Sequence, residues 1–235
     1  MGEPYYTRGQ PTRSPNSILV IFSYTGEKYA EVCIAGMEDQ ARAADCATLG
    51  FAETKILPGH RRAEILRLIA DKIEEHREEF IQILVHKSGK PVREAHREVT
   101  RAVSMMRMPA EESVRLTGKV IPMDSTEFGE GYTGYYYTVP SGPALCITPF
   151  NYPLNLTCHK IGPAIAAGCS FVLKPSTKAP LSALLLARLI RGRKRDTRQT
   201  PSMWFHALDS TPRHWYVTLG LPCCPLQGAQ QSTGG

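Results

Sequence analysis

Asn151 is the first side chain of this sequence whose surroundings suit polar chemistry on a small ligand. It lies between Pro149 and Pro153, which restrict the backbone and favour an extended segment. An amide held rigidly in this way can donate a hydrogen bond to an oxygen that develops negative charge. Asparagine beside proline is also typical of an ordinary turn. The residues alone leave both interpretations open.

Lys174 is the second candidate. It follows the apolar run Phe171–Leu173 and precedes Pro175, Ser176 and Thr177. A lysine at the end of a buried strand can present its ammonium group to a ligand. It can equally pack its aliphatic stem along the strand and leave the ammonium group in water.

The elements around these residues predict a β-α-β unit. Ala144–Thr148 and Ser170–Leu173 are apolar runs typical of buried strands, and Leu154–Ala167 and Leu181–Ile190 are predicted helices. Parallel strands joined by a helix bind ligands beyond the carboxyl ends of the strands. The segments 148–151 and 174–177 both lie at such ends, so we expect them to share one site.

The rest of the chain predicts a helical part and two flanking segments. Residues 1–17 are rich in proline and polar residues and are expected to be a disordered leader. Short strands are expected at 18–22 and 30–34, and helices at 38–51, 61–87 and 92–116. Tyr132–Val139 has the aromatic composition of a strand. From Arg191 to Gly235 no periodicity is found, and a disordered tail is expected.

Bulk composition favours a soluble globular protein of the cytoplasm. The 235 residues are 42% hydrophobic and 21% charged, without an apolar run that is long enough to span a membrane. Of the net charge of +6, four charges belong to the tail beyond Ile190. Seven cysteines are scattered without metal-type spacing. No metal site is expected, and reduced thiols are favoured over disulfides.

Three stretches carry a resemblance to a known family. They are ITPFNYPLNL at 147–156, HKIGPAIAAG at 159–168 and FVLKPS at 171–176. They resemble the start of the cofactor-binding domain of the NAD(P)-dependent aldehyde dehydrogenases, in particular the branch with non-phosphorylating glyceraldehyde-3-phosphate, lactaldehyde and phosphonoacetaldehyde dehydrogenases. The resemblance covers residues 18–190. It implies an α/β fold, with an N-terminal helical part and the first β-α-β of a Rossmann-like domain whose sheet is incomplete.

The resemblance also implies roles for individual residues. Asn151 corresponds to the asparagine that stabilises the thiohemiacetal oxyanion, and Lys174 to the lysine that binds the adenine ribose. The other residues expected at the cofactor are Thr148, Pro149, Phe150, Ser176 and Thr177. Many family members have a glutamate where this chain has Thr177. A hydroxyl beside ammonium groups can accept a 2′-phosphate that a carboxylate repels, so weak binding that favours NADP over NAD is expected.

The family's nucleophilic cysteine and general-base glutamate have no counterpart in their expected contexts. The parent activity is oxidation of a small aldehyde to an acid, and we expect this chain to be inactive alone. The tail beyond Arg191 is interpreted as a shifted reading frame or as a basic arm.

Two alternatives to an enzyme remain open. In the first alternative, the chain is a non-catalytic isoform that associates with family subunits through Tyr132–Val139. In the family, this region forms part of the hairpin at the subunit contact. A weaker alternative is a basic-tailed nucleic-acid binder. We do not expect nucleic acid to be a partner, because no basic residues interleave with the tyrosines of Tyr132–Val139.

Overall fold

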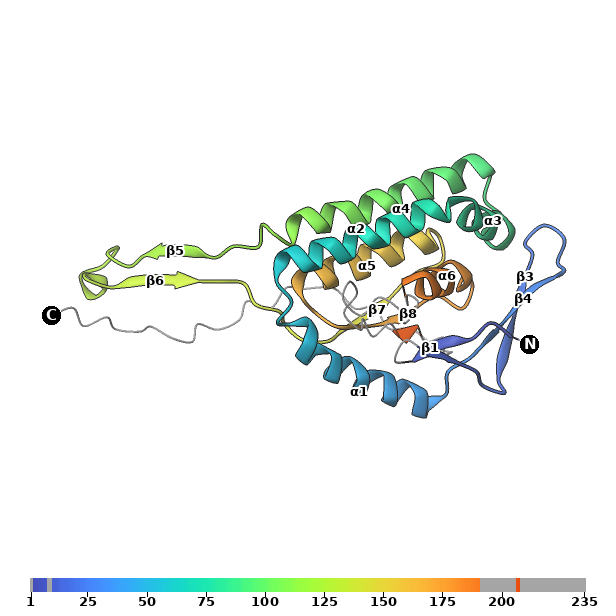
Figure 1. The fold of residues 1–235 in the computed structure, drawn as a ribbon, viewed down its shortest axis with the longest axis horizontal. Coiled ribbons are helices and arrows are strands. Elements are labelled where there is room, and N and C mark those ends of the chain that lie inside the picture. Colours follow the sequence, from blue (N-terminus) through green and yellow to red (C-terminus); the bar gives the residue numbers. More distant parts are fainter. Residues whose placement is uncertain (1, 8–9, 191–205, 208–235) are drawn as a thin grey trace. The chain divides into compact units, whose positions relative to one another are not determined.

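The computed structural model describes residues 2–7, 10–190 and 206–207, and these divide into two compact units (Figure 1). The larger unit contains the described residues up to Arg115 and from Pro140 onward, and the smaller unit contains Leu116–Val139. Across the described ranges, no helix combines the length and the apolar character that crossing a membrane requires.

The predicted β-α-β unit is present in the larger unit. Strands β7 (Ala144–Ile147) and β8 (Phe171–Lys174) are parallel neighbours, and helix α5 (Pro153–Ala167) connects them. Helix α6 (Leu181–Ile190) follows β8. Gly168 ends α5 with a φ of 78°, a left-handed conformation that glycine adopts without strain. The expected α/β class is confirmed.

The sheet is wider than the two strands that the sequence predicts. Its order is β2-β1-β9-β8-β7, with β1 at Tyr5–Thr7, β2 at Gln10–Thr12 and β9 at His206–Ala207. The backbone of β9 runs parallel to β8, and β1 is antiparallel to β9. The added strands have only two or three residues, too few for a periodic signal. Among the described strands, β7 has a neighbour on one side only.

The prediction of a disordered leader is wrong for the described residues of 1–17. Tyr5 and Tyr6 are buried, and Arg13 donates a 2.6 Å hydrogen bond to the Gly2 carbonyl. Burial, followed by a hydrogen bond with Asp39 of helix α1 (Met37–Thr54), raises the pKa of Tyr5. Two buried aromatic rings supply enough apolar contact to order a segment that its composition marks as disordered. The expected tail lies outside the described residues, apart from β9.

The helical part precedes the β-α-β unit. It contains the strands β3 (Ser17–Ile21) and β4 (Lys28–Cys33) and the helices α1 (Met37–Thr54), α2 (Gly59–Glu75), α3 (Arg77–Ser88) and α4 (Val92–Glu112). The single helix predicted for 61–87 is wrong. His76 leaves the helical conformation, with φ −106° and ψ 24°. The break lets α3 turn away from α2 and contact α6.

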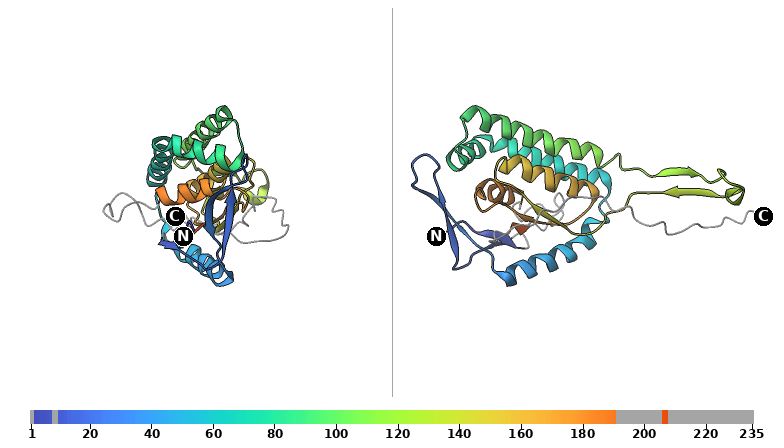
Figure 2. Two further views of the ribbon diagram at one scale, coloured as in Figure 1. Left: turned by 90° about the vertical axis from the view of Figure 1, so that its right-hand side faces the viewer. Right: turned by 180° about the vertical axis from the view of Figure 1, so that it is seen from behind.

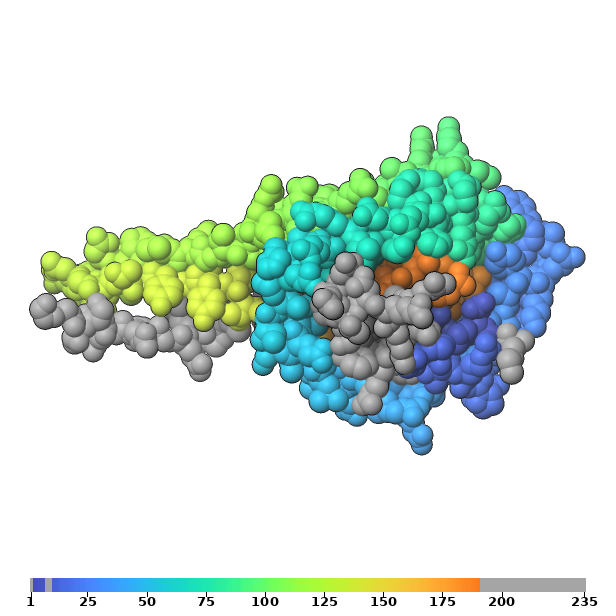
Figure 3. All heavy atoms as spheres, viewed as in Figure 1, coloured from blue at the N-terminus to red at the C-terminus, as the bar shows by residue number. Residues whose placement is uncertain are grey.

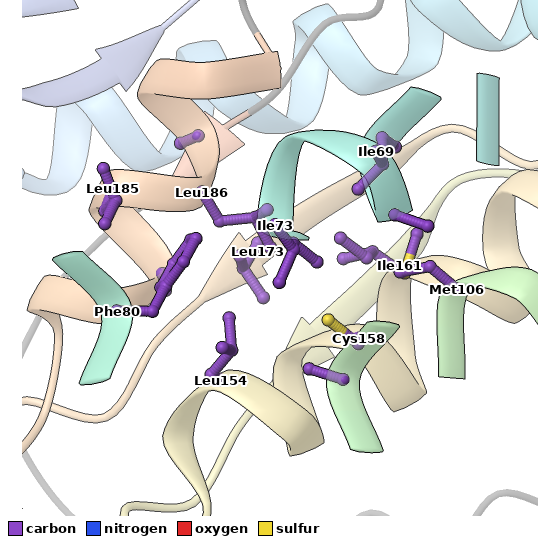
Figure 4. Close-up of a cluster of buried hydrophobic side chains, with 14 of the residues drawn as sticks. Ile69, Ile73, Phe80, Met106, Leu154, Cys158, Ile161, Leu173, Leu185 and Leu186 are labelled. Carbon is purple, nitrogen blue, oxygen red and sulfur yellow. The ribbon is translucent and has the colours of Figure 1, made fainter. Parts of the chain in front are cut away.

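These elements form layers around a core (Figure 2). Helices α5 and α6 pack on one face of the sheet, α2 and α4 pack over α5, and α1 packs against β8. Figure 4 shows side chains of α2, α4, α5, β8 and α6 meeting in one apolar cluster, with Ile73, Leu154 and Leu173 near its centre. The core therefore lies on the helical side of the strands that carry the candidate site.

A groove of about 370 Å³ lies elsewhere in the larger unit, between α6, α3 and the N-terminal strands. Figure 3 shows α6, in orange, exposed between the teal helices and the blue strands. Leu181, Leu184 and Leu185 line its α6 side. No predicted site residue is among those that line it, so the cofactor prediction concerns a different place.

The smaller unit is a β-hairpin. Strands β5 (Lys119–Pro122) and β6 (Thr133–Tyr136) are antiparallel, with the short 3₁₀ helix η1 (Glu127–Gly129) in the connection. Val120 pairs with Tyr135, and both side chains are exposed. Phe128, in the connection, is 94% exposed. The predicted strand in 132–139 is present.

Candidate functional site

The two predicted loops start beside each other at the carboxyl ends of β7 and β8. Ile147 is in register with Lys174, and the Thr148 N–H donates a 3.1 Å hydrogen bond to the Lys174 carbonyl. Thr148 is buried and Lys174 is half-buried. A parallel pair with this register brings the segments 148–151 and 174–177 together, as the sequence predicts.

A lysine that the sequence prediction missed connects the two loops. The Lys178 ammonium group lies 4.6 Å from the centre of the Phe150 ring, a cation–π distance. Phe150 is exposed, as is Pro149. Lys178 is exposed as well, and it follows Lys174 by four residues in the loop after β8.

Ser176 and Thr177 form the turn that leads into α6. The Ser176 hydroxyl accepts a 3.3 Å hydrogen bond from the Lys178 N–H, and the Ser176 carbonyl accepts one of 3.0 Å from Ala179. Both hydroxyl side chains are half-buried between the two lysines. The turn therefore offers hydroxyl groups and two ammonium groups to an anionic ligand.

Asn151 directly precedes α5. Tyr152 is the N-cap residue and Pro153 is the first helical residue, a position where its fixed φ is favourable and no N–H is needed. The Asn151 side chain is exposed at the strand-end edge. The prolines on either side thus fix where the helix starts and where the amide is presented.

A buried carboxylate, which the sequence prediction also missed, binds the start of α5. Glu98 of α4 is 0% exposed, and its Oε1 accepts hydrogen bonds from the N–H groups of Leu154 (3.0 Å) and Asn155 (3.2 Å). Its Oε2 accepts a hydrogen bond from the Lys90 ammonium group. A phosphate at this helix end would compete with an internal carboxylate, so the α5 N-terminus does not offer the usual phosphate site.

Positive charges gather around Tyr152. The Lys90 ammonium group lies 4.0 Å, and the Arg101 guanidinium carbon 5.6 Å, from the centre of the Tyr152 ring. Burial, followed by the charges of Arg101 and Lys160, lowers the pKa of His159. Of the two cations at the Tyr152 ring, Lys90 is paired with Glu98, which leaves the Arg101 guanidinium group for an anion.

None of the cysteines that the structure describes is placed as a nucleophile. All five are buried: Cys33, Cys46, Cys146, Cys158 and Cys169. Burial raises the pKa of the Cys146 thiol to about 11, and burial with the charge of Glu98 raises that of Cys158. Figure 4 shows Cys158 within the apolar cluster. Cys223 and Cys224 lie outside the described residues.

Comparisons with known proteins identify the family of the chain. The aldehyde dehydrogenase family profile matches residues 10–194. The 3-sulfolactaldehyde dehydrogenase of Priestia aryabhattai is 37% identical over 185 residues, which cover 79% of this chain and 38% of that enzyme.

Two solved structures resemble the fold. Aldehyde dehydrogenase 21 of Physcomitrella patens, in complex with the reaction product succinate, has a TM-score of 0.83 and 32% identity over 89% of this chain and 43% of its own. The glyceraldehyde-3-phosphate dehydrogenase GapN of Methanocaldococcus jannaschii, complexed with NADP, has a TM-score of 0.75 and 32% identity over 84% and 42%. The chain thus spans less than half the length of these relatives. The family resemblance seen in the sequence is confirmed, and the chain belongs to the aldehyde dehydrogenase family.

Proposed function

We propose that this chain supplies the cofactor-side part of an NAD(P)-dependent aldehyde dehydrogenase site. The observation that carries the proposal is the pairing of the two strand-end loops, where the Thr148 N–H bonds to the Lys174 carbonyl. In the proposed reaction an aldehyde is oxidised to a carboxylic acid by hydride transfer to the cofactor. Asn151 donates a hydrogen bond to the oxyanion of the reacting carbonyl. Thr148, Pro149 and Phe150 line the cofactor site from the β7 side.

The preferred cofactor in this proposal is NADP. Lys174 binds the adenine ribose, and Ser176 and Thr177 offer hydroxyl groups to the 2′-phosphate. Lys178 adds a second positive charge 4.6 Å above the Phe150 ring. Without a carboxylate at position 177, no charge in this turn opposes a phosphate. The NADP complex of the similar GapN structure supports this preference.

We also propose that the aldehyde carries an anionic group. Arg101 is exposed and lies over Tyr152 together with Lys90. The three similar proteins are named for, or bound to, a sulfonated aldehyde, a dicarboxylate product and a phosphorylated aldehyde. The exposed Arg101 guanidinium over Tyr152 suits such substrates, because it can hold the anion while the Asn151 amide binds the carbonyl oxygen.

The isolated chain should bind cofactor weakly and have no turnover. The reaction needs a thiolate nucleophile, and burial raises the pKa of Cys146 to about 11 and also raises the pKa of Cys158. Production of NADPH from succinate semialdehyde by the purified chain, abolished by Asn151→Ala, would contradict this expectation.

Calorimetric titration of the full chain with NADP and NAD tests the cofactor proposal. We expect a lower Kd for NADP, and Lys174→Ala should raise that Kd about tenfold, equivalent to about 1.4 kcal/mol. The matched control is Lys55→Ala, an exposed lysine at the end of α1. Tight NAD binding that is insensitive to Lys174→Ala would overturn the proposal.

A second candidate function is association with family subunits through Tyr132–Val139. The observation that favours it is the exposure of apolar and aromatic side chains on the hairpin, with Phe128 at 94% and Tyr137 at 71%. Exposed patches of this kind often mark protein contacts. A chain that acts in this way needs no nucleophile of its own.

A further inference from the structure

The carboxylate of Glu98 holds a central position between the core and the strand-end site. It belongs to α4, yet its three polar contacts lie on α5 and on Lys90, which precedes α4. Because Pro153 has no N–H, Leu154 and Asn155 carry the first two backbone donors of α5, and both donate to Glu98. One side chain therefore fixes the whole donor set at the start of this helix.

The second carboxylate oxygen of Glu98 connects it, through Lys90, to the ring of Tyr152. It pairs with Lys90, whose side chain is 14% exposed and whose ammonium group lies 4.0 Å from the centre of the Tyr152 ring. The backbone after Asn151 and the ring next to it are thus both connected to Glu98. A change at this carboxylate must reach Asn151 from two directions.

We infer that Glu98 and Lys90 are positioning residues for Asn151, beyond their contribution to stability. Glu98 sets the direction in which α5 leaves the loop, and Lys90 sets the Tyr152 ring against it. Neither side chain touches the reacting atoms. The inference rests on the proposed function in one respect, the role of Asn151 in the site.

Two substitutions separate positioning from folding. Glu98→Gln keeps a carbonyl oxygen for the N–H groups of Leu154 and Asn155 but loses the ion pair, and Lys90→Met keeps the carboxylate but loses the cation over Tyr152. The matched control is Ser170→Ala. Ser170 is buried and donates a 2.6 Å hydrogen bond to the Ala47 carbonyl at the opposite end of β8.

The first readout is NMR on the full chain labelled with ¹⁵N and 3-fluorotyrosine. Asn151→Asp assigns the side-chain amide signal of Asn151, and Tyr152→Phe assigns the fluorine signal of Tyr152. We expect both signals to shift in Glu98→Gln and in Lys90→Met and to stay unchanged in Ser170→Ala. The second readout is the Kd for NADP, which should rise about fivefold in the first two variants, equivalent to about 1 kcal/mol.

The outcomes distinguish the two proposals. If the first two variants lower the urea midpoint as Ser170→Ala does and leave the Asn151 and Tyr152 signals unchanged, the positioning role is wrong. If the wild-type chain does not bind NADP while the signals shift as expected, the cofactor proposal fails and the positioning role stands. Lys90→Met keeps the Glu98 oxygen that accepts both hydrogen bonds from α5, so it remains informative if Glu98→Gln does not fold.

Discussion

Helices α5 and α6 begin at the same edge of the sheet in two different ways. At the start of α5, the N–H groups of Leu154 and Asn155 bind the buried carboxylate of Glu98. At the start of α6, the approach is a turn with Lys174 and Lys178, and within the described residues no carboxylate bonds to its first N–H groups. The first helix end is fixed and closed to phosphate, whereas the turn before the second carries two lysines and no carboxylate. We therefore expect a rigid helix start at α5 and anion binding at the turn before α6.

The largest expected effect is the loss of stability when the Glu98 carboxylate at the start of α5 is removed. Glu98→Ala leaves Lys90 without its buried partner and two backbone donors unsatisfied, so unfolding in urea should lose about 3–5 kcal/mol. Ser170→Ala, which removes one buried hydrogen bond at the other end of the sheet, should lose about 1–3 kcal/mol. Equal losses in the two variants would show that α5 does not depend on Glu98.

The next effect concerns Cys146 in strand β7, whose thiol is expected to stay neutral. Burial raises the pKa of Cys146 from 9.0 to about 11, so the folded state holds this proton more tightly than the unfolded state. The resulting stability is present below pH 9 and is lost as the pH rises towards 11, by about 2–3 kcal/mol at most. Cys146→Ala should lose less stability over this range in urea titrations. An identical pH dependence in the two proteins would contradict the neutral thiol.

A third prediction concerns a carboxylate introduced into the turn before α6. Thr177→Glu should weaken NADP binding about tenfold, because the new charge opposes the 2′-phosphate, and should change NAD binding little. Thr177→Gln, of similar size without charge, is the control. A similar loss in both variants would indicate that size, and not charge, decides at this position.

The smallest effect on folding is expected in the β5–β6 hairpin, which contains no residue of either helix start. Tyr135→Glu changes an exposed side chain and should alter the free energy of unfolding by less than about 0.5 kcal/mol. It should nevertheless weaken association with a full-length family subunit in sedimentation experiments. The control is Tyr24→Glu, an exposed tyrosine in the turn between β3 and β4. An unchanged sedimentation profile would argue against the hairpin as the contact.

The sequence predicted the parts whose signal is local. The motif around Asn151, the apolar run before Lys174 and the left-handed Gly168 each define their element directly. That both loops lie at the same edge of the sheet could be predicted from the connection rule for parallel strands. The placement of the two loops was therefore predictable, and only their detailed contacts were not.

The sequence did not reveal features that depend on distant partners. Glu98 lies 56 residues from the donors it binds, although its position on the inward face of α4, between Ala95 and Ala102, was an available signal. His76 breaks the predicted helix without a glycine or proline. Tyr5 and Tyr6 order a segment whose composition indicates disorder. Tertiary contacts decided each of these cases.

Chemical-shift mapping of NADP binding on the ¹⁵N-labelled chain tests the contrast between the two helix ends most directly. The account predicts that NADP most strongly shifts the amide signals of the residues other than proline in 174–178 and 148–151. The signals of Leu154 and Asn155, which are already bonded to Glu98, should change little. Strong shifts at Leu154 and Asn155, with none at 174–178, would contradict it and would place the phosphates at the start of α5.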